Sequence, residues 1–248
     1  EETLSAYHQA RERGTHLLAV TSGGALAKES TKNRTPLMRL DYKGEPRSAV
    51  AYSFGMLLAL LCKLGLLENK KAELQEAVQL LLQMVSVLKP EAPKVQNLAK
   101  TLATAMHGRL PAIYGSEFLS AVARRWKTQL NENGKVWAFH ESLPELNHNS
   151  VVGYSLPTEV RERAYVVLLH SRLLHKRISL RYQVTEELLL REGVAHRQVE
   201  GLGDTPLAHL LTTVLLGDFV SYYVGILNQA DPGPVPAIDY LKSRLSAS

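Results

Sequence analysis

Length, composition and charge are those of an ordinary soluble globular protein of 248 residues. Its single cysteine, Cys62, cannot form an internal disulfide, and its apolar neighbours favour a buried, inert thiol. The formal net charge of +5 would suit a nucleic-acid partner, but the basic residues are scattered, so we expect none. Polar interruptions in the longest apolar run, residues 49–67, predict a core helix and no membrane span. The start of the chain lacks an apolar signal region, which favours a cytoplasmic location.

The first part of the chain predicts short strands at residues 17–20 and 36–40. Helices are predicted at residues 1–13, 46–67, 73–88 and 95–107, with a helix start at 25–29. Thr21, Ser22, Gly23 and Gly24 connect the first strand to that helix start. Free backbone N–H groups at a helix start can hold an anion, and the alternative is a simple tight turn.

The second part alternates between short apolar strands and helices. Strands are predicted at residues 111–114, 136–140, 165–169 and 195–199, and helices at 117–130, 185–191, 206–228 and 236–245. Asp204, Thr205 and Pro206 predict the start of the helix at 206–228, because they form a good cap followed by Pro. Such alternation predicts a parallel sheet covered by helices on both faces, which is a doubly wound three-layer α/β fold. We place the boundary between two lobes at residues 108–110.

The central stretch carries the most informative residues. Phe118, Val122, Trp126 and Leu130 recur every four residues and therefore share one helical face, and the helix should end near residues 133–134, where Asn and Gly tolerate the left-handed conformation. The carboxylate of Glu132 could act as a base, and the imidazole of His148 in the next polar turn could give and take a proton in the same cleft. On spacing alone, both side chains could equally be solvated residues of polar turns.

The sequence motifs in this stretch indicate a protein family. LNENGK at residues 130–135, followed by LPELNHNSVVGY at residues 143–154, resembles the bifunctional phosphoglucose/phosphomannose isomerases of the sugar isomerase (SIS) superfamily. Three further segments agree in order: TSGG at 21–24, PRSA at 46–49 and AIDYLKSRL at 237–245. The resemblance covers essentially the whole chain. It implies two SIS-type three-layer αβα lobes with parallel sheets, the first (1–108, with linking helices) N-terminally truncated and the second at 109–248.

The resemblance also implies an activity, which is the interconversion of glucose 6-phosphate or mannose 6-phosphate with fructose 6-phosphate through an enediol(ate). Glu132 would be the base, and His148 would assist ring opening from the other subunit of a homodimer. Arg47 would stabilise the enediolate, and Lys242 would lie near the ring-opening chemistry, although a lysine on a terminal helix is commonly just solvated. The implied substrate-binding residues are Thr21, Ser22, Gly23 and Gly24. No cofactor and no metal are expected, because the spacing of His140, Glu141, Glu145 and His148 matches no known zinc motif.

Two departures from the family pattern bear on activity. Gly233 occupies the place of a family threonine before the last helix and supplies no hydroxyl. The Ser-Gly-Asn-Thr phosphate-binding loop and an upstream Gly-Gly-Ser loop, which relatives place before the helix that begins here at residue 1, are not in the sequence. We therefore expect little isomerase activity from the 248-residue chain by itself. The alternative function is a non-catalytic sugar-phosphate-binding SIS module or an inactive fragment of such an isomerase.

Overall fold

The computed structural model describes residues 2–245, which form two compact units that meet in sequence between Lys70 and Lys71. Glu1, in the first predicted helix, and residues 246–248, at the end of the predicted second lobe, lie outside the described residues. The second unit thus begins earlier in sequence than the lobe predicted from residue 109. It takes in two helices that we had grouped with the first lobe as linking helices.

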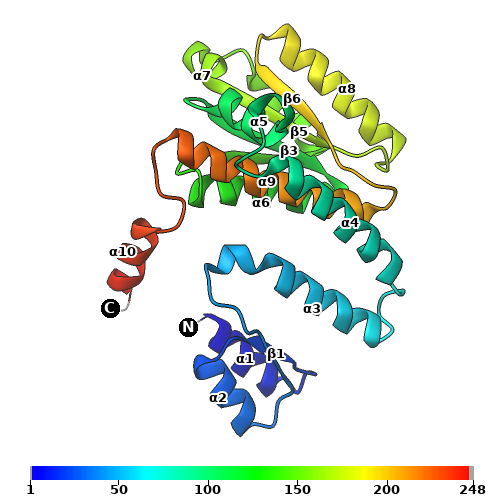
Figure 1. Ribbon diagram of the computed structural model, residues 1–248, viewed down its shortest axis with the longest axis vertical. Helices are drawn as coiled ribbons and strands as arrows, with labels where there is room; N and C mark the ends of the chain where they lie inside the picture. Colours follow the sequence, from blue (N-terminus) through cyan, green and yellow to red (C-terminus); the bar gives the residue numbers. More distant parts are fainter. Residues whose placement is uncertain (1, 246–248) are drawn as a thin grey trace. The chain divides into compact units, whose positions relative to one another are not determined.

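The first unit is a small α/β unit in which two strands form a parallel sheet. Its elements, visible at the blue end of the chain in Figure 1, are α1 (Glu2–Glu12), β1 (Ala19–Thr21), α2 (Gly24–Lys32), β2 (Leu37–Arg39), a 3-10 turn at Pro46–Ala49 and α3 (Val50–Lys63). Ala19 lies opposite Leu37 and Thr21 opposite Arg39 in the parallel register. Two strands were predicted for the first part of the chain and four for the second, and the two observed sheets have two and four strands.

The long apolar helix of the first unit differs from its prediction. The predicted helix at 46–67 begins with the 3-10 turn, and α3 ends at Lys63. None of its residues is buried, and the side chains of Tyr52 and Leu57 are 49% and 52% exposed. The expectation of a core helix is therefore wrong for this unit, because two three-residue strands offer too little apolar surface to cover fourteen residues. Cys62 is accordingly half-buried, and its Sγ donates to the Glu68 carbonyl at 3.2 Å.

The second unit contains a four-stranded sheet and the remaining helices (Figure 1). Its helices are α4 (Lys71–Leu88), α5 (Leu98–Met106), α6 (Ser120–Glu132), α7 (Thr158–Arg163), α8 (Lys176–Arg191), α9 (Pro206–Leu227) and α10 (Pro236–Leu245). The strands are β3 (Leu110–Ser116), β4 (Phe139–Leu143), β5 (Ala164–His170) and β6 (Ala195–Glu200). Short 3-10 turns occur at Lys94–Gln96, Glu117–Leu119, Glu145–His148 and Ser150–Gly153. Every strand of this unit was predicted, whereas α7 and the first half of α8 were not.

All four strands of the second sheet run parallel in the order β4-β3-β5-β6, and helices cover both faces. Alternate residues of β5 point to opposite faces, as strand geometry requires. Val167 and Leu169 pack with α5, α6 and α9, while Val166 and Leu168 pack with α8 and the turn after β4. This confirms the predicted α/β arrangement of a helix-covered parallel sheet for the second unit.

The central element of the second unit is α9, which packs against α4, α5 and α6. The side-chain oxygen of Thr205 caps its start by accepting from the Ala208 N–H at 3.3 Å, and Pro206 follows, as predicted. Among the described helices, α9 alone is long and apolar enough to cross a membrane by length and composition. Half of its most apolar stretch is buried inside the unit, as in the core helix of a globular protein. The packing on α9 explains why α4 and α5 belong to the second unit.

The strand predicted at residues 136–140 is displaced. The observed β4 begins at Phe139 and continues to Leu143, and the Trp137 side chain is 74% exposed. Val136 belongs to the turn that ends α6 and not to the strand. Its N–H donates to the Leu130 carbonyl, and its carbonyl accepts from the Asn131 side-chain amide at 2.8 Å. The prediction of a buried strand at 136–138 is therefore wrong, although Ala138 itself is buried.

Candidate functional site

Glu132, the predicted base, is the last residue of α6, on a turn that is fastened to α9. The face of α6 behind it is buried as predicted, with Val122, Trp126 and Leu130 at most 2% exposed. Two amides then join the turn to α9. The Asn133 Nδ2 donates to the Ser221 Oγ at 3.0 Å, and the Asn228 Nδ2 donates to the Gly134 carbonyl at 2.7 Å. The half-buried Glu132 is thus positioned by a rigid support in place of a free loop.

The glycines around this turn permit close approach. A Cβ on Gly134 would lie 2.6 Å from the Leu130 carbonyl oxygen, and one on Gly225 would lie 2.5 Å from the Asn133 carbonyl oxygen. The left-handed conformation that we predicted for residues 133–134 occurs one residue later. Asn133 has φ −88°, whereas Lys135 has φ +52°. The Asn-Gly pair was therefore the right signal for the helix end, but the glycine is required by packing.

Lys135 joins the turn to the segment that leads into α10. Its Nζ donates to the Glu132 carbonyl at 2.5 Å and to the Pro234 carbonyl at 2.6 Å. The first bond places a cation at the carboxyl end of α6, where it complements the helix dipole. The second bond reaches a residue almost one hundred positions further along the chain.

His148 lies in the 3-10 turn Glu145–His148 that follows β4, and it is exposed. Its neighbour Asn147 anchors this turn to α8. The Asn147 Nδ2 donates to the Thr185 Oγ1 at 2.8 Å, and the Arg181 Nη1 donates to the Asn147 Oδ1 at 3.3 Å. The imidazole of His148 therefore lies at the surface, on a turn that hydrogen bonds hold to α8.

The topology separates the two predicted acid/base residues within one chain. Glu132 ends the helix that returns from the carboxyl edge of β3, so it lies at the amino edge of the sheet, before β4. His148 follows the carboxyl end of β4. Because β4 has five residues at about 3.3 Å each, the two residues are separated by roughly 15 Å along the strand direction. The second unit of one chain therefore does not bring the two side chains together.

The predicted substrate loop, Thr21 to Gly24, follows the carboxyl end of β1 in the first unit. The Thr21 Oγ1 donates to the Gly23 carbonyl at 2.9 Å and lies 3.2 Å from the Gly23 N–H, so this hydroxyl folds back on its own loop. The helix α2 begins at Gly24 without a side-chain cap, and Ser22 is exposed. A hollow next to this start is lined by the side chains of Lys28, Lys32 and Arg39, together with Gly24, Ala27 and Thr31.

Arg47 belongs to the same unit as the substrate loop. It lies in the 3-10 turn before α3, with Pro46 at the first position of the turn. Its side chain is only 8% exposed, and its Nη1 lies 3.2 Å from the Glu45 carboxylate. The guanidinium is thus held in a fixed place, as charge stabilisation requires.

Lys242, the remaining predicted site residue, is on α10, which has no buried residue. Its side chain is exposed. The bond from Lys135 to Pro234 is a described attachment just before this helix.

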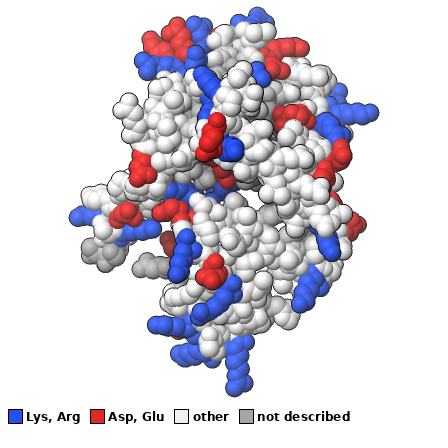
Figure 2. Space-filling model, in the orientation of Figure 1, with Lys and Arg blue, Asp and Glu red and all other residues white. Residues whose placement is uncertain are grey.

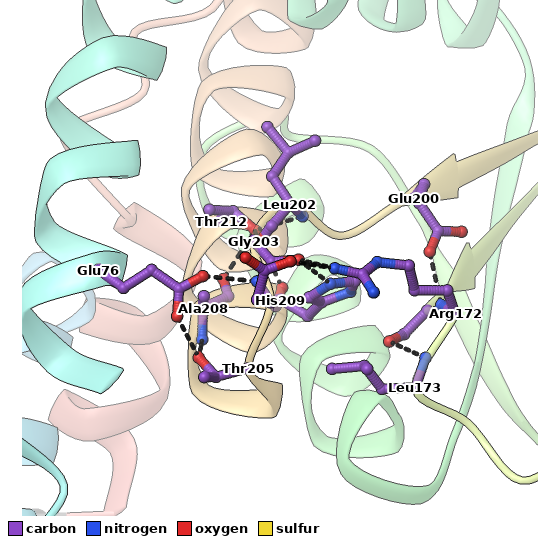
Figure 3. Close-up of polar contacts among 12 residues, drawn as sticks. Glu76, Arg172, Leu173, Glu200, Leu202, Gly203, Thr205, Ala208, His209 and Thr212 are labelled. Carbon is purple, nitrogen blue, oxygen red and sulfur yellow. Dashed lines mark hydrogen bonds and ion pairs between the residues drawn. The ribbon is translucent and has the colours of Figure 1, made fainter. Parts of the chain in front are cut away.

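The sequence analysis missed a polar network at the carboxyl edge of the second sheet (Figure 3). The Glu200 carboxylate accepts from the Arg172 N–H at 2.6 Å and lies 2.5 Å from the His170 Nδ1, and the Arg172 guanidinium pairs with Asp204. From α4, the Glu76 carboxylate accepts from the Asp204 N–H at 2.5 Å and from the Thr205 hydroxyl at 2.8 Å. The rule that functional residues follow the carboxyl ends of parallel strands would have identified His170 and Glu200. The network holds the loops after β5 and β6 against the start of α9.

The described residues contain no group of three or more His, Cys, Asp or Glu side chains suited to a metal ion. On the face seen in Figure 2, basic and acidic side chains are interspersed over the second unit, and basic ones predominate at the lower end of the view, over the first unit. On this face the basic side chains over the second unit do not form one continuous track.

Comparison with known proteins shows which family and which relatives the chain resembles. The family model "Bacterial phospho-glucose isomerase C-terminal SIS domain" matches residues 95–245. The bifunctional phosphoglucose/phosphomannose isomerase of Caldicellulosiruptor bescii is 38% identical over 247 residues, which cover 99% of this chain and 73% of the relative. The enzyme of the same description from Aquifex aeolicus is 34% identical, with 99% of this chain and 72% of the relative covered.

Comparison with solved structures identifies a similar fold. The crystal structure of tagatose-6-phosphate ketose/aldose isomerase from Escherichia coli superposes with a TM-score of 0.66, over 94% of this chain and 68% of that structure. The sequence identity is 15%, so this likeness supports the fold alone. Together with the family match at residues 95–245, the two parallel sheets identify a SIS-like α/β arrangement.

Proposed function

Because the chain belongs to the bifunctional phosphoglucose/phosphomannose isomerase family, we propose that it is an aldose–ketose isomerase of six-carbon sugar phosphates. Its substrates would be glucose 6-phosphate and mannose 6-phosphate, and both would give fructose 6-phosphate. The observation that carries the proposal is a carboxylate, Glu132, on a turn braced to α9 within the matched family region.

The reaction needs a ring opening followed by a proton transfer between two carbons. His148 protonates the ring oxygen as the bond from C1 to that oxygen breaks, while the O1 hydroxyl gives its proton to water and the C1=O1 carbonyl forms. Lys242 assists this step. Glu132 then removes the C2 proton, the electron pair of that bond forms the C1–C2 double bond, and negative charge develops on O1. The proton of the O2 hydroxyl then moves to O1. As the C2=O2 carbonyl forms, the electron pair of the C1–C2 double bond takes the proton from Glu132 at C1, which completes the open-chain ketose. Arg47 faces the developing enediolate charge, and the loop from Thr21 to Gly24 contacts the substrate.

A second copy of the chain would complete each site. β4 is at the edge of the sheet, with Glu132 before its amino end and His148 after its carboxyl end. A two-fold axis perpendicular to β4 reverses the direction of the strand in the second copy. It therefore brings the histidine of one copy to the level of the glutamate of the other, in two equivalent places, as a closed homodimer requires.

The surface beside β4 supports such a contact. Trp137, Val152 and Leu156 are 74%, 78% and 72% exposed, and the rings of Trp137 and Phe139 lie 5.1 Å apart between centroids. Phe139 and Leu156 also line one hollow, so apolar side chains from β4 and from the segment after it lie near each other there. Exposed apolar side chains that gather in this way are typical of a protein interface. We expect a Trp137→Asp, Val152→Asp double variant to be a monomer by analytical ultracentrifugation and to have lost isomerase activity.

The first test is hydrogen exchange at C2. The parent is the 248-residue chain or, where this does not turn over, the chain joined to the part of the Caldicellulosiruptor bescii relative that it does not cover. Glu132→Gln should bind substrate but lose deuterium incorporation into glucose 6-phosphate by about 10²-fold or more, because no other group takes the carbon-bound proton. Glu187→Gln, which alters an exposed glutamate of α8, is the matched control. Exchange at the parental rate in Glu132→Gln would exclude this base.

The second test is subunit mixing. Glu132→Gln and His148→Ala subunits are each inactive alone, and mixed dimers should contain one intact site. Recovery of activity on mixing supports shared sites, and a lack of recovery between folded, dimerising subunits contradicts them. A parent that binds sugar phosphates but isomerises none in either form would identify the chain as a non-catalytic binding module.

A further inference from the structure

Lys135 has a backbone conformation that favours glycine. Its φ of +52° lies in the left-handed region, which non-glycine residues occupy at a cost. A residue retained there at such a cost is a sign that its side chain has a role. The side chain of Lys135 indeed reaches two backbone carbonyls, those of Glu132 and Pro234.

The two carbonyls belong to two segments that carry proposed catalytic residues. One is the carbonyl of the proposed base itself, at the end of α6. The other lies two residues before α10, the helix that carries Lys242. No residue of α10 is buried, so hydrogen bonds to the segment before it contribute to its position. An ammonium that binds both carbonyls holds this segment next to the turn of the proposed base.

We propose that Lys135 is a positioning residue that fastens the α10 segment to the Glu132 turn and so places Lys242 for ring opening. This inference rests on the proposed function in its catalytic part, while the fastening itself is a property of the fold. Lys135 does not touch the reacting carbons in this role. Its contribution is the fixed geometry of two elements that are almost one hundred residues apart in sequence.

The fastening is tested by amide hydrogen exchange on the 248-residue chain. In Lys135→Gly the backbone cost is relieved but the ammonium is gone, so the chain should stay folded while residues 229–236 exchange at least about tenfold faster. Lys135→Met should show the same increase, and Lys135→Arg should restore slow exchange, because a guanidinium also donates to two carbonyls. Lys176→Met, at the exposed start of α8, should behave as the parent. Unchanged exchange at 229–236 in Lys135→Gly would overturn the proposal.

The catalytic role is tested on the active parent described above. Lys135→Gly should lower kcat by about 10- to 100-fold with little change in KM, because the substrate still binds while the two elements are misplaced. The losses in Lys135→Gly and Lys242→Met should be non-additive in the double variant, since one residue acts through the other. Fully additive losses, or a parental kcat in Lys135→Gly, would overturn the role. A parent without isomerase activity would refute the proposed function, and the exchange result would still decide the fastening.

Discussion

The support behind Glu132 can be tested by adding one methyl group to α9. In Gly225→Ala the new Cβ would lie 2.5 Å from the Asn133 carbonyl oxygen, whereas ordinary contacts begin at 3.4 Å. The turn must therefore retreat by about 0.9 Å. A misplacement of about 1 Å in a catalytic group can cost about 10²-fold in rate, so we expect kcat to fall by that order.

The stability of the same variant should change little. Overpacking of this kind costs about 1–3 kcal/mol, and replacing glycine by alanine inside a helix returns about 1 kcal/mol. The net loss in the free energy of unfolding should be about 0–2 kcal/mol. Urea unfolding measures it, and fructose 6-phosphate formation by the active parent gives kcat.

Gly217→Ala is the matched control, two turns earlier on the same helix. Its Cβ would overlap the indole ring of Trp126, which is 1% exposed and whose Nε1 donates to the Thr213 carbonyl at 2.9 Å. Overpacking and the lost hydrogen bond should together cost about 3 kcal/mol after the helix gain. The folded fraction should nevertheless keep its kcat. If Gly225→Ala retains the parental kcat, or if both variants lose rate equally, the position of the Glu132 turn does not control catalysis.

Three further predictions follow from the second unit and the relatives. Asn97→Ala should lower the free energy of unfolding by about 2–3 kcal/mol in urea titrations, because the buried amide of Asn97 donates to the Leu88 carbonyl at 2.9 Å and its oxygen caps α5. Burial raises the pKa of Asp218 in the folded state despite its ion pair with Arg125, so the folded chain holds that proton more tightly than the unfolded chain. The stability of the parent relative to Asp218→Asn should thus be greatest at low pH and fall as the pH rises through the folded pKa; a difference independent of pH would contradict this. Finally, joining the part of the Caldicellulosiruptor bescii relative that the chain does not cover should raise isomerase activity at least about tenfold over the 248-residue chain, through added phosphate contacts. Equal activity would show that the phosphate is held by residues already present.

The sequence by itself determined the local elements and the family. The four-residue spacing of Val122, Trp126 and Leu130 predicted the buried face of α6, and Thr205 followed by Pro206 predicted the start of α9. These signals are local, because side chains three or four positions apart on a helix and the caps of its ends interact within a few residues. The motifs around Glu132 and His148 indicated the family that the comparisons show.

Only the tertiary structure decided which distant residues meet. Periodicity cannot state that α4 and α5 pack on α9, that Lys135 reaches Pro234, or that Glu76 caps the start of α9, because each contact joins segments with unrelated local patterns. The same reason applies to the candidate site. Glu132 and His148 are sixteen positions apart in sequence, yet the parallel direction of β3 and β4 places them at opposite edges of one sheet.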